Sequence, residues 1–298
     1  MRNVTVAATQ MIGGWDVDQN IQRAERLVRD AVSKGAQIVL LQELFERNYF
    51  CQKQKPEYLD FATSVDENPA VQHFSKIAKE LKVVLPISIY ERAGHCLYNS
   101  VVILDADGSN LGVYRKSHIP DGPGYSEKYY FTPGDTGFKV FDTQYAKIGV
   151  GICWDQWFPE CARSMALMGA ELLFYPTAIG TEPHDATINS SGHWQRTQQG
   201  HAAANVTPLI ASNRIGTETE GDYSITFYGC SFIADESGEK VQEAGRTEEE
   251  VLVHTFDLDA IAATRRAWGV FRDRRIDLYG AVLTKDGVTK QPKTQGDN

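Results

Sequence analysis

The stretch "AKIGVGICWDQWFPECARSMALMGAELLFYPT", residues 146–177, contains the units that decide the fold. An apolar strand ends at Cys153, a helix runs from Pro159 to Met168, and Gly169 separates this helix from the next strand, "AELLFYPT". A strand, a helix and a second apolar strand in this order predict a layered α/β protein. The turn also brings the cysteine to the edge of the sheet, where backbone N–H groups and the helix dipole stabilise negative charge.

A similar order occurs near the N-terminus. Apolar residues recur at helical spacing through residues 16–33, and Gly35 ends this expected helix. The segments "SKGAQIVLLQE" (33–43) and "LMGAELLFYPT" (167–177) both pass from a helix end through Gly-Ala into an apolar strand. We interpret this likeness as a sign of two similar layers.

The remaining segments fit the same architecture. A second helix is expected to begin at Pro69, with Asn68 as its cap. Strands are predicted for "VVLPISIYE", "LYNSVVILD", "LGVYRK", "FKVFD" and "AKIGVGI", with a further helix over residues 191–206. Strand pairs mixed with helices predict an α/β sandwich, in which two sheets carry helices on their outer faces. We expect one domain over residues 1–280 and a partly flexible C-terminal tail over residues 281–298.

Composition narrows the functional classes. The chain has 298 residues, of which 42% are hydrophobic and 23% charged, as in ordinary globular proteins. No run approaches the roughly 18 apolar residues of a membrane span, and the N-terminus is typical of a strand, so no membrane association and a cytoplasmic location are expected. The net charge of −9, without a basic tract, disfavours nucleic acid as a partner and mildly favours a small cation.

The five cysteines are odd in number and scattered, which disfavours a disulfide framework or a zinc site. We therefore expect reduced thiols, no metal and no cofactor. Free cysteines usually act as small buried hydrophobic residues, and this is our interpretation of the four cysteines other than Cys153. A cysteine nucleophile needs a proton acceptor and a group that stabilises an oxyanion, and no histidine stands at a matching position.

Two charged residues also stand at strand ends, as Cys153 does. Glu43 follows "IVLLQ", and Lys116 ends "LGVYRK". Each alone would be interpreted as a surface residue. Reactive side chains at three strand ends are what a shared cleft requires.

The local sequences around these residues resemble those of the nitrilase superfamily of carbon–nitrogen hydrolases. The matches are Glu43 in "LLQELF", Lys116 in "VYRKSHIP" and Cys153 in "GICWDQWFPE", in the order of the family's catalytic triad. The resemblance covers roughly residues 1–280 and implies a four-layer α-β-β-α sandwich. A second glutamate of that family matches Glu127 in "GYSEKYYFTPGD".

Within the superfamily, the chain is similar to the branch that hydrolyses N-carbamoylputrescine. The similar segments are "QELFERNYFCQ", "DGPGYSEKYYFTPGDTGFKVF", "GICWDQWFPE", "YPTAIGTEP" and "HWQRTQQGHAAAN". The resemblance implies formation of putrescine, CO2 and ammonia through a cysteine acyl-enzyme, in polyamine biosynthesis from agmatine. It also implies homo-oligomers, dimers or higher, in which a C-terminal segment reaches a neighbour.

The resemblance assigns a role to each reactive residue. Cys153 attacks the ureido carbonyl, and Glu43 takes the thiol proton and passes it to the departing ammonia. Lys116 and backbone N–H groups near Trp154 hold the oxyanion. The positive charge of Lys116 is expected to favour the thiolate form of the cysteine, and Glu127 to orient Lys116 or the substrate.

A cationic ureido substrate needs a carboxylate at the far end of its slot, and Glu182, in the loop after "LLFYP", is our candidate for this contact. Tyr49 and Trp154 are candidates for the slot's walls. Weaker candidates for the carboxylate are Asp121, Asp155 and Glu46.

Other interpretations remain open at this stage. A related amidase, a β-ureidopropionase or a D-amino acid carbamoylase would share the fold. The last two act on ureido acids, so they need Arg or Lys at the far end of the slot, where we expect Glu182. Nitrile hydrolysis uses the same triad. From a different class, a non-catalytic scaffold or thiol sensor would use Cys153 as a reactive thiol only, without the two charged partners.

Overall fold

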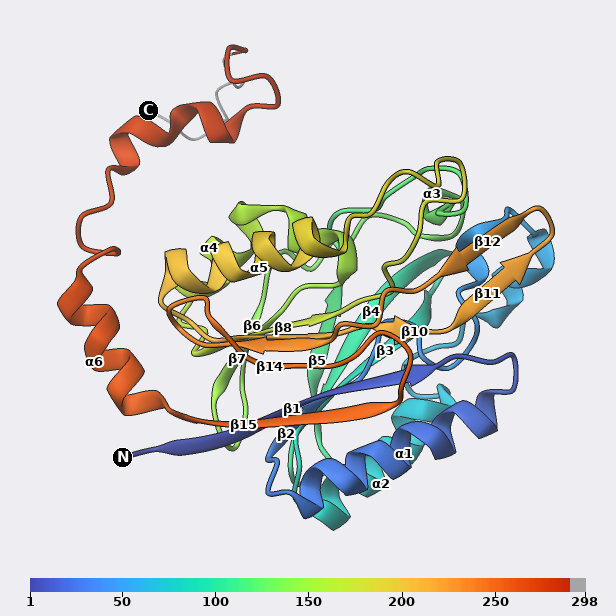
Figure 1. The fold of residues 1–298 in the computed structure, drawn as a ribbon, viewed down its shortest axis with the longest axis horizontal. Helices are drawn as coiled ribbons and strands as arrows, with labels where there is room; N and C mark the ends of the chain where they lie inside the picture. The colour runs from blue at the N-terminus through green and yellow to red at the C-terminus, as the bar shows by residue number, and fades with distance from the viewer. Residues whose placement is uncertain (290–298) are drawn as a thin grey trace.

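The computed structural model describes residues 1–289 as a four-layer α-β-β-α sandwich (Figure 1). Two sheets face each other, α1 and α2 cover the outer face of the first sheet, and α4 and α5 cover that of the second (Figure 1). The fold class expected from the sequence is confirmed. The four covering helices are α1 (Val17–Ser33), α2 (Pro69–Leu81), α4 (Pro159–Leu167) and α5 (Ser191–Asn205).

The first sheet has β1 near its centre. This strand pairs antiparallel with β15 and parallel with β2, and a parallel bridge between Ile38 and Val84 joins β2 to the antiparallel strands β3, β4 and β5. The cap predicted for α2 is present, since Asn68 accepts a hydrogen bond from the Val71 N–H. Asp16 caps α1 in the same way by accepting from the Gln19 N–H. The strands are β1 (Asn3–Ile12), β2 (Ile38–Leu40), β3 (Leu85–Ala93), β4 (Cys96–Leu104), β5 (Asn110–Arg115) and β15 (Glu250–Asp257).

The second sheet has the order β14-β13-β9-β8-β7-β6. Its central strands β7, β8 and β9 are parallel, as a strand-helix-strand sequence requires. The strands are β6 (Val140–Asp142), β7 (Lys147–Val150), β8 (Leu172–Pro176), β9 (Leu209–Ser212), β13 (Phe232–Ala234) and β14 (Lys240–Glu243).

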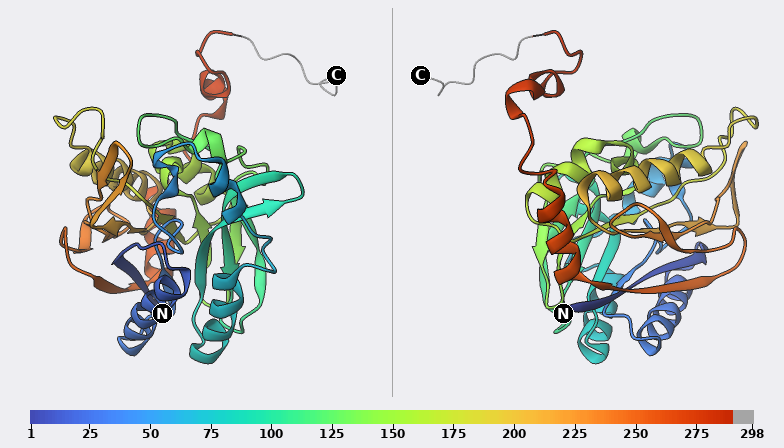
Figure 2. Two further views of the ribbon diagram at one scale, coloured as in Figure 1. Left: turned by 90° about the vertical axis from the view of Figure 1, so that its right-hand side faces the viewer. Right: turned by 60° about the vertical axis from the view of Figure 1, so that its left-hand side comes forward.

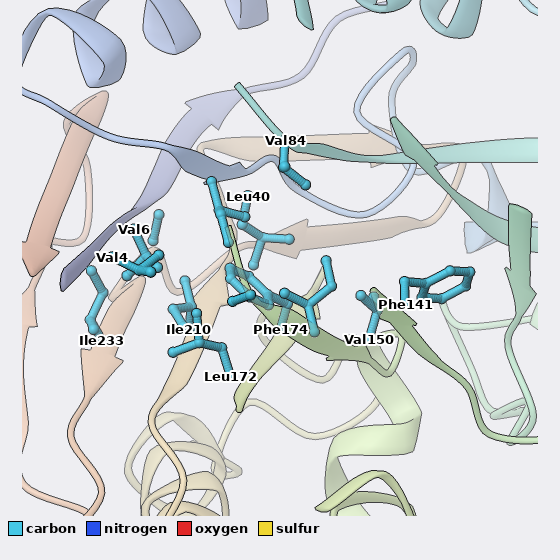
Figure 3. Packing of buried hydrophobic residues seen from close by; sticks show 14 of the residues in the cluster. Val4, Val6, Leu40, Val84, Phe141, Val150, Leu172, Phe174, Ile210 and Ile233 are labelled. Atoms are coloured by element: carbon cyan, nitrogen blue, oxygen red, sulfur yellow. The ribbon is translucent and has the colours of Figure 1, made fainter. Parts of the chain in front are cut away.

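The central core fills the space between the two sheets. Val4, Val6 and Leu40 of the first sheet meet Leu172, Phe174 and other residues of the second sheet in a single apolar cluster (Figure 3). The five named side chains are at most 2% exposed. This packing fixes the two sheets against each other, so loops at the strand ends keep a set position.

A smaller group of elements lies at one end of the sandwich, near α3 (Glu127–Tyr130) (Figure 1). It contains the hairpin of β11 (Thr217–Glu220) and β12 (Tyr223–Thr226), which the sequence analysis did not predict. The short strand β10 (Arg214–Ile215) pairs with the end of β1, so the chain passes here from the second sheet to the first.

The C-terminal segment leaves the body of the molecule. After α6 (Leu258–Trp268), the chain extends outward to the short 3-10 helix Ile276–Leu283, which stands apart in both views of Figure 2 and buries none of its residues. The domain limit expected at residue 280 stays a prediction, and part of the expected tail lies outside the described residues. Within residues 1–289, no helix is long and apolar enough to cross a membrane.

Candidate active site

The turn after β7 presents Cys153 in a conformation unusual for its residue type. Its φ angle of +42° lies in the left-handed region, which costs a non-glycine residue about 1–3 kcal/mol. Asp155 holds this turn, because its Oδ2 accepts the Ile152 N–H at 2.9 Å and its own N–H donates to the Ile152 carbonyl at 2.9 Å. The thiol therefore begins the 3-10 helix Cys153–Trp157, whose first N–H groups have no partner within the helix.

Glu43, Lys116 and Glu127 meet in one buried cluster. The Lys116 ammonium donates to Glu43 Oε1 at 2.9 Å and to Glu127 Oε2 at 2.6 Å. All three side chains are at most 1% exposed. One ammonium group between two carboxylates is a buried arrangement in which each charge has a partner.

Two further side chains fix this cluster. Asn99 of β4 donates from Nδ2 to Glu43 Oε1 at 2.7 Å, and its backbone carbonyl accepts the Lys116 N–H at 2.8 Å. The Tyr49 hydroxyl donates to Glu127 Oε1 at 2.7 Å. Asn99 was not among the predicted site residues, although an amide inside the apolar run "LYNSVVIL" is the feature that could have revealed it.

Burial and charge set the protonation states of the cluster. Burial opposes the charge of Lys116, but the carboxylates of Glu127 and Glu43 outweigh it and raise the pKa of Lys116 well above its ordinary value. Burial raises the pKa of Glu127 to about 7, with the Lys116 charge acting in the opposite direction. The ammonium group is therefore a permanent charge at neutral pH.

Burial and nearby carboxylates oppose ionisation of the Cys153 thiol. Burial raises its pKa well above the ordinary value, the Glu43 carboxylate raises it further, and the opposing effect of Lys116 is too small to reverse this. Lys116 thus acts on the thiol in the expected direction, while burial and the carboxylates of Glu43 and Glu127 act against it. Glu43 Oε2 accepts no hydrogen bond from the described residues, which leaves it available as a proton acceptor.

A cavity of about 540 Å³ opens beside Cys153. Trp154, Glu127 and Glu182 line it together with the cysteine, as expected for three of the candidate residues. None of its described lining residues is Arg or Lys. The other lining residues are Pro120, Asp121, Gly122, Pro123, Tyr125, Gln156, Trp157, Ala178, Ile179, His184, Ser190 and His193.

Comparison with known proteins identifies the family. The model of the carbon–nitrogen hydrolase family matches residues 5–266. The chain belongs to this family.

Individual relatives of this carbon–nitrogen hydrolase cover nearly its whole length. It is 62% identical to an N-carbamoylputrescine amidase from Solanum lycopersicum, over 96% of this chain and 97% of the relative. It is 52% identical to a citrullinase from Francisella tularensis, over 96% of this chain and 100% of the relative. A crystal structure of a carbon–nitrogen hydrolase from Helicobacter pylori superimposes with a TM-score of 0.89 at 40% identity, covering 95% and 99% of the two chains. The protein is therefore an enzyme that hydrolyses carbon–nitrogen bonds.

The carboxylate of Glu182 lies in a partly enclosed part of this hydrolase's cavity. Its side chain is 27% exposed, and burial raises its pKa. The ring of Tyr125 lies in the same region, and its hydroxyl donates to the Thr181 carbonyl at 3.1 Å. The loop that carries Glu182 is thus hydrogen-bonded to the loop that carries Tyr125.

Three candidates for substrate contact lie elsewhere. Tyr49 does not line the cavity, because its ring is buried between Tyr125 and Phe227 and its hydroxyl is bonded to Glu127. Asp155 is buried under the cysteine turn. Glu46 is buried beside Asn68, whose amide donates to both of its oxygens. Asp121 is the only one of the weaker carboxylate candidates that lines the cavity within the described residues.

The described residues contain no group of His, Cys, Asp and Glu side chains that could hold a metal ion.

Proposed function

We propose that this hydrolase converts N-carbamoylputrescine and water into putrescine, CO2 and ammonia, with Glu43, Lys116 and Cys153 as catalytic residues. The observation that carries the proposal is the cavity, in which the nucleophile and the carboxylate of Glu182 share one space without any Arg or Lys among the described lining residues. An acidic slot of this kind suits a ureido compound with an ammonium tail. The identity of 62% to a plant N-carbamoylputrescine amidase supports the same substrate.

In the first half of the reaction, Cys153 Sγ forms a bond to the ureido carbon while Glu43 Oε2 takes the thiol proton. The carbonyl oxygen becomes an oxyanion, which Lys116 and the N–H groups at the start of the 3-10 helix stabilise. The bond to the terminal nitrogen then breaks, and Glu43 passes its proton to this nitrogen, which leaves as ammonia. The acyl group that remains on sulfur carries the whole diamine.

In the second half, Glu43 takes a proton from a water molecule that attacks the acyl carbon. The C–S bond breaks, and the proton returns to sulfur. The released carbamate loses CO2 and leaves putrescine, so one water molecule is consumed in the overall reaction. Glu127, bonded to Lys116 and Tyr49, keeps the ammonium group oriented through both halves.

Glu182 is proposed to bind the ammonium tail. It lies on the loop after β8 and faces the same cavity as the reacting sulfur. Trp154 and Trp157 line the cavity between polar groups, and their ring centroids are 6.2 Å apart, which provides an apolar surface for the methylene chain. Aromatic faces also attract a cationic tail.

A second candidate substrate is citrulline, because a citrullinase is 52% identical to this chain. Citrulline has the same ureido group, but its tail carries a carboxylate as well as an amine. The cavity offers His184 and His193 as partners for such a carboxylate. The acidic residues of the cavity favour N-carbamoylputrescine over citrulline.

The substrate proposal is tested by ammonia release from N-carbamoylputrescine, citrulline and N-carbamoyl-β-alanine under identical conditions. We expect the highest kcat/KM for N-carbamoylputrescine. In Glu182→Gln, KM for N-carbamoylputrescine should rise on the order of 10- to 100-fold, because a charge-assisted hydrogen bond contributes about 1.5–3 kcal/mol.

Asp121→Asn is the matched control, since this exposed carboxylate lines the same cavity. Its effect on KM should stay within about threefold, as for other weakly buried charges. A preference for citrulline or for the carbamoyl acid, or an unchanged KM in Glu182→Gln, would sink the assignment of the tail site.

We also propose that the enzyme works in putrescine formation in the cytoplasm as a homo-oligomer. All five cysteines are free in the structure, which fits a reducing compartment. The exposed apolar residues of the C-terminal segment support association with a second copy.

A further inference from the structure

We infer that Asn213 and Arg214 are positioning residues that set the general base Glu43 against the nucleophile Cys153. The inference rests on the proposed function, because it assigns Glu43 the role of proton acceptor. The two residues are neighbours in sequence, and their side chains bind the backbone of two different loops, one from each sheet.

Arg214 holds the loop that carries Glu43. Its Nε and Nη2 donate to the Glu43 carbonyl at 3.3 and 3.0 Å, Nη2 donates to the Leu44 carbonyl at 2.5 Å, and Nη1 donates to the Arg47 carbonyl at 2.9 Å. The side chain is 2% exposed. Leu44 has a φ of +48°, so the chain turns sharply where the guanidinium group binds it.

Glu218 of β11 completes this arrangement. Its Oε1 accepts from Arg214 Nη1 at 2.9 Å, and its Oε2 accepts the Tyr49 N–H at 2.5 Å. Tyr49 in turn donates to Glu127, which binds Lys116. The ion pair of Arg214 and Glu218 therefore contacts both ends of the segment that runs from Glu43 to Tyr49.

Asn213 holds the other side of the site. Its Oδ1 accepts the Ile179 N–H at 2.9 Å, and its Nδ2 donates to the carbonyls of Ile179 and Gly229, each at 3.0 Å. Ile179 follows Ala178, whose carbonyl oxygen lies 3.9 Å from Cys153 Sγ. Asn213 thus fixes the backbone that contacts the nucleophile.

The position of the pair in the fold explains why it has this role. Asn213 lies between β9 of the second sheet and β10, and Arg214 is the first residue of β10, which pairs with β1 of the first sheet. Glu43 follows the first sheet's β2, and Cys153 follows the second sheet's β7. The dipeptide is therefore a short covalent link between the two sheets, with one side chain bonded to the loop on each side.

The test compares Arg214→Lys with the milder Glu218→Gln. Lysine keeps the charge but cannot donate to three carbonyls in the fixed geometry of arginine. We expect kcat for N-carbamoylputrescine to fall on the order of 10- to 100-fold in Arg214→Lys, since small displacements of a proton acceptor have effects of this size, with KM within about threefold of wild type. Glu218→Gln should show a smaller loss of kcat in the same direction.

Alkylation of Cys153 by iodoacetamide, followed on its peptide by mass spectrometry, gives a readout that needs no substrate. The alkylation rate at pH 7 should be lower in both variants than in wild type. It should approach the wild-type rate at higher pH, where hydroxide takes the thiol proton in place of the displaced Glu43 carboxylate. If alkylation is slowed in the variants but the wild type does not hydrolyse N-carbamoylputrescine, the proposed substrate is wrong and the positioning role is supported.

Arg265→Lys is the matched control, because Arg265 also donates twice to one backbone carbonyl, that of Val206, at 3.0 and 2.8 Å, but lies on α6 outside the site. It should retain wild-type kcat and alkylation. The inference is overturned if Arg214→Lys and Glu218→Gln retain wild-type kcat and the wild-type alkylation profile.

Discussion

At the scale of single residues, the reactivity of Cys153 depends on neighbours far away in the sequence. The strand-to-helix turn in "GVGICWDQWF" predicts where this thiol lies, because turn geometry is local. Its protonation depends on burial and on Glu43, Glu127 and Lys116, which tertiary packing brings together. A thiol that is only 7% exposed also argues against a simple thiol sensor, which needs an accessible thiol.

Tyr49 and Glu182 also show the difference between what local sequence determines and what tertiary packing determines. Both were candidates for substrate contact from their surrounding sequence, yet only Glu182 lines the cavity. The Tyr49 hydroxyl donates to Glu127, and Arg214 binds the backbone of the same segment at the Arg47 carbonyl. No local sequence pattern encodes either contact. Side-chain direction in an irregular loop is therefore beyond what the sequence predicts.

Glu46 provides a prediction on pH and stability. Burial raises its pKa from 4.5 to about 7. Between these values the folded protein binds more protons than the unfolded chain, so its stabilising contribution, complete below pH 4.5, is lost as pH rises to about 7. Glu46→Gln removes this titration. The free energy of unfolding of the variant minus that of wild type should therefore rise on the order of 3 kcal/mol between pH 4.5 and pH 8.

Urea unfolding of both proteins at the two pH values measures this difference. Glu57→Gln, in which the replaced carboxylate is exposed, serves as the control and should show no such change. An equal stability difference between wild type and Glu46→Gln at both pH values would contradict the burial argument.

At the scale of elements, the sequence predicts those that have local causes. The helices α1 and α2 begin as expected because Asp16 and Asn68 cap them. The hairpin of β11 and β12 was missed because "TETEGDYSIT" is polar and short, and its stability comes from contacts such as the bond between the Thr181 N–H and the Thr226 carbonyl.

Asp155 shows how a single side chain stabilises an element. Its two oxygens accept from the N–H and Nδ1 of His118, the Tyr114 hydroxyl and the Ile152 N–H. Asp155→Asn replaces one acceptor oxygen with a donor, so two of these four donors lose their partner. We expect a loss of about 3 kcal/mol of stability and a kcat reduced at least about tenfold, because the cysteine turn relaxes.

Thermal unfolding and steady-state kinetics check this prediction together. Asp142→Asn is a suitable comparison, since its side chain is 78% exposed on β6 and should leave both quantities unchanged. Wild-type kcat in Asp155→Asn would show that the turn does not depend on this carboxylate.

At the scale of the whole molecule, the pattern of strands and helices predicts the sandwich, whereas the extended C-terminal segment was expected only from the family resemblance. Alternating strands and helices with apolar faces define layers, whereas the segment after Trp268 has apolar residues without a covering surface in one chain. Ile276, Leu278 and Val282 are 73%, 66% and 62% exposed. Such a segment is typical of a surface that a second copy covers.

This arrangement predicts the effect of truncation. Removal of residues 270–298 should convert the proposed oligomer into smaller species in sedimentation velocity. The double variant Ile276→Asp, Leu278→Asp should act in the same direction, because charges at these positions are unfavourable in an apolar interface. Full-length protein that sediments as a monomer, or variants with an unchanged sedimentation coefficient, would contradict this prediction.

In the proposed reaction, Cys153 carries the acyl group of a cationic ureido substrate. Mass spectrometry of enzyme quenched during turnover of N-carbamoylputrescine tests this most directly. We predict an adduct on the Cys153 peptide whose mass equals the substrate less ammonia, and no adduct in Cys153→Ala, which should be inactive. Hydrolysis without any adduct on this peptide, or undiminished activity in Cys153→Ala, would contradict the account.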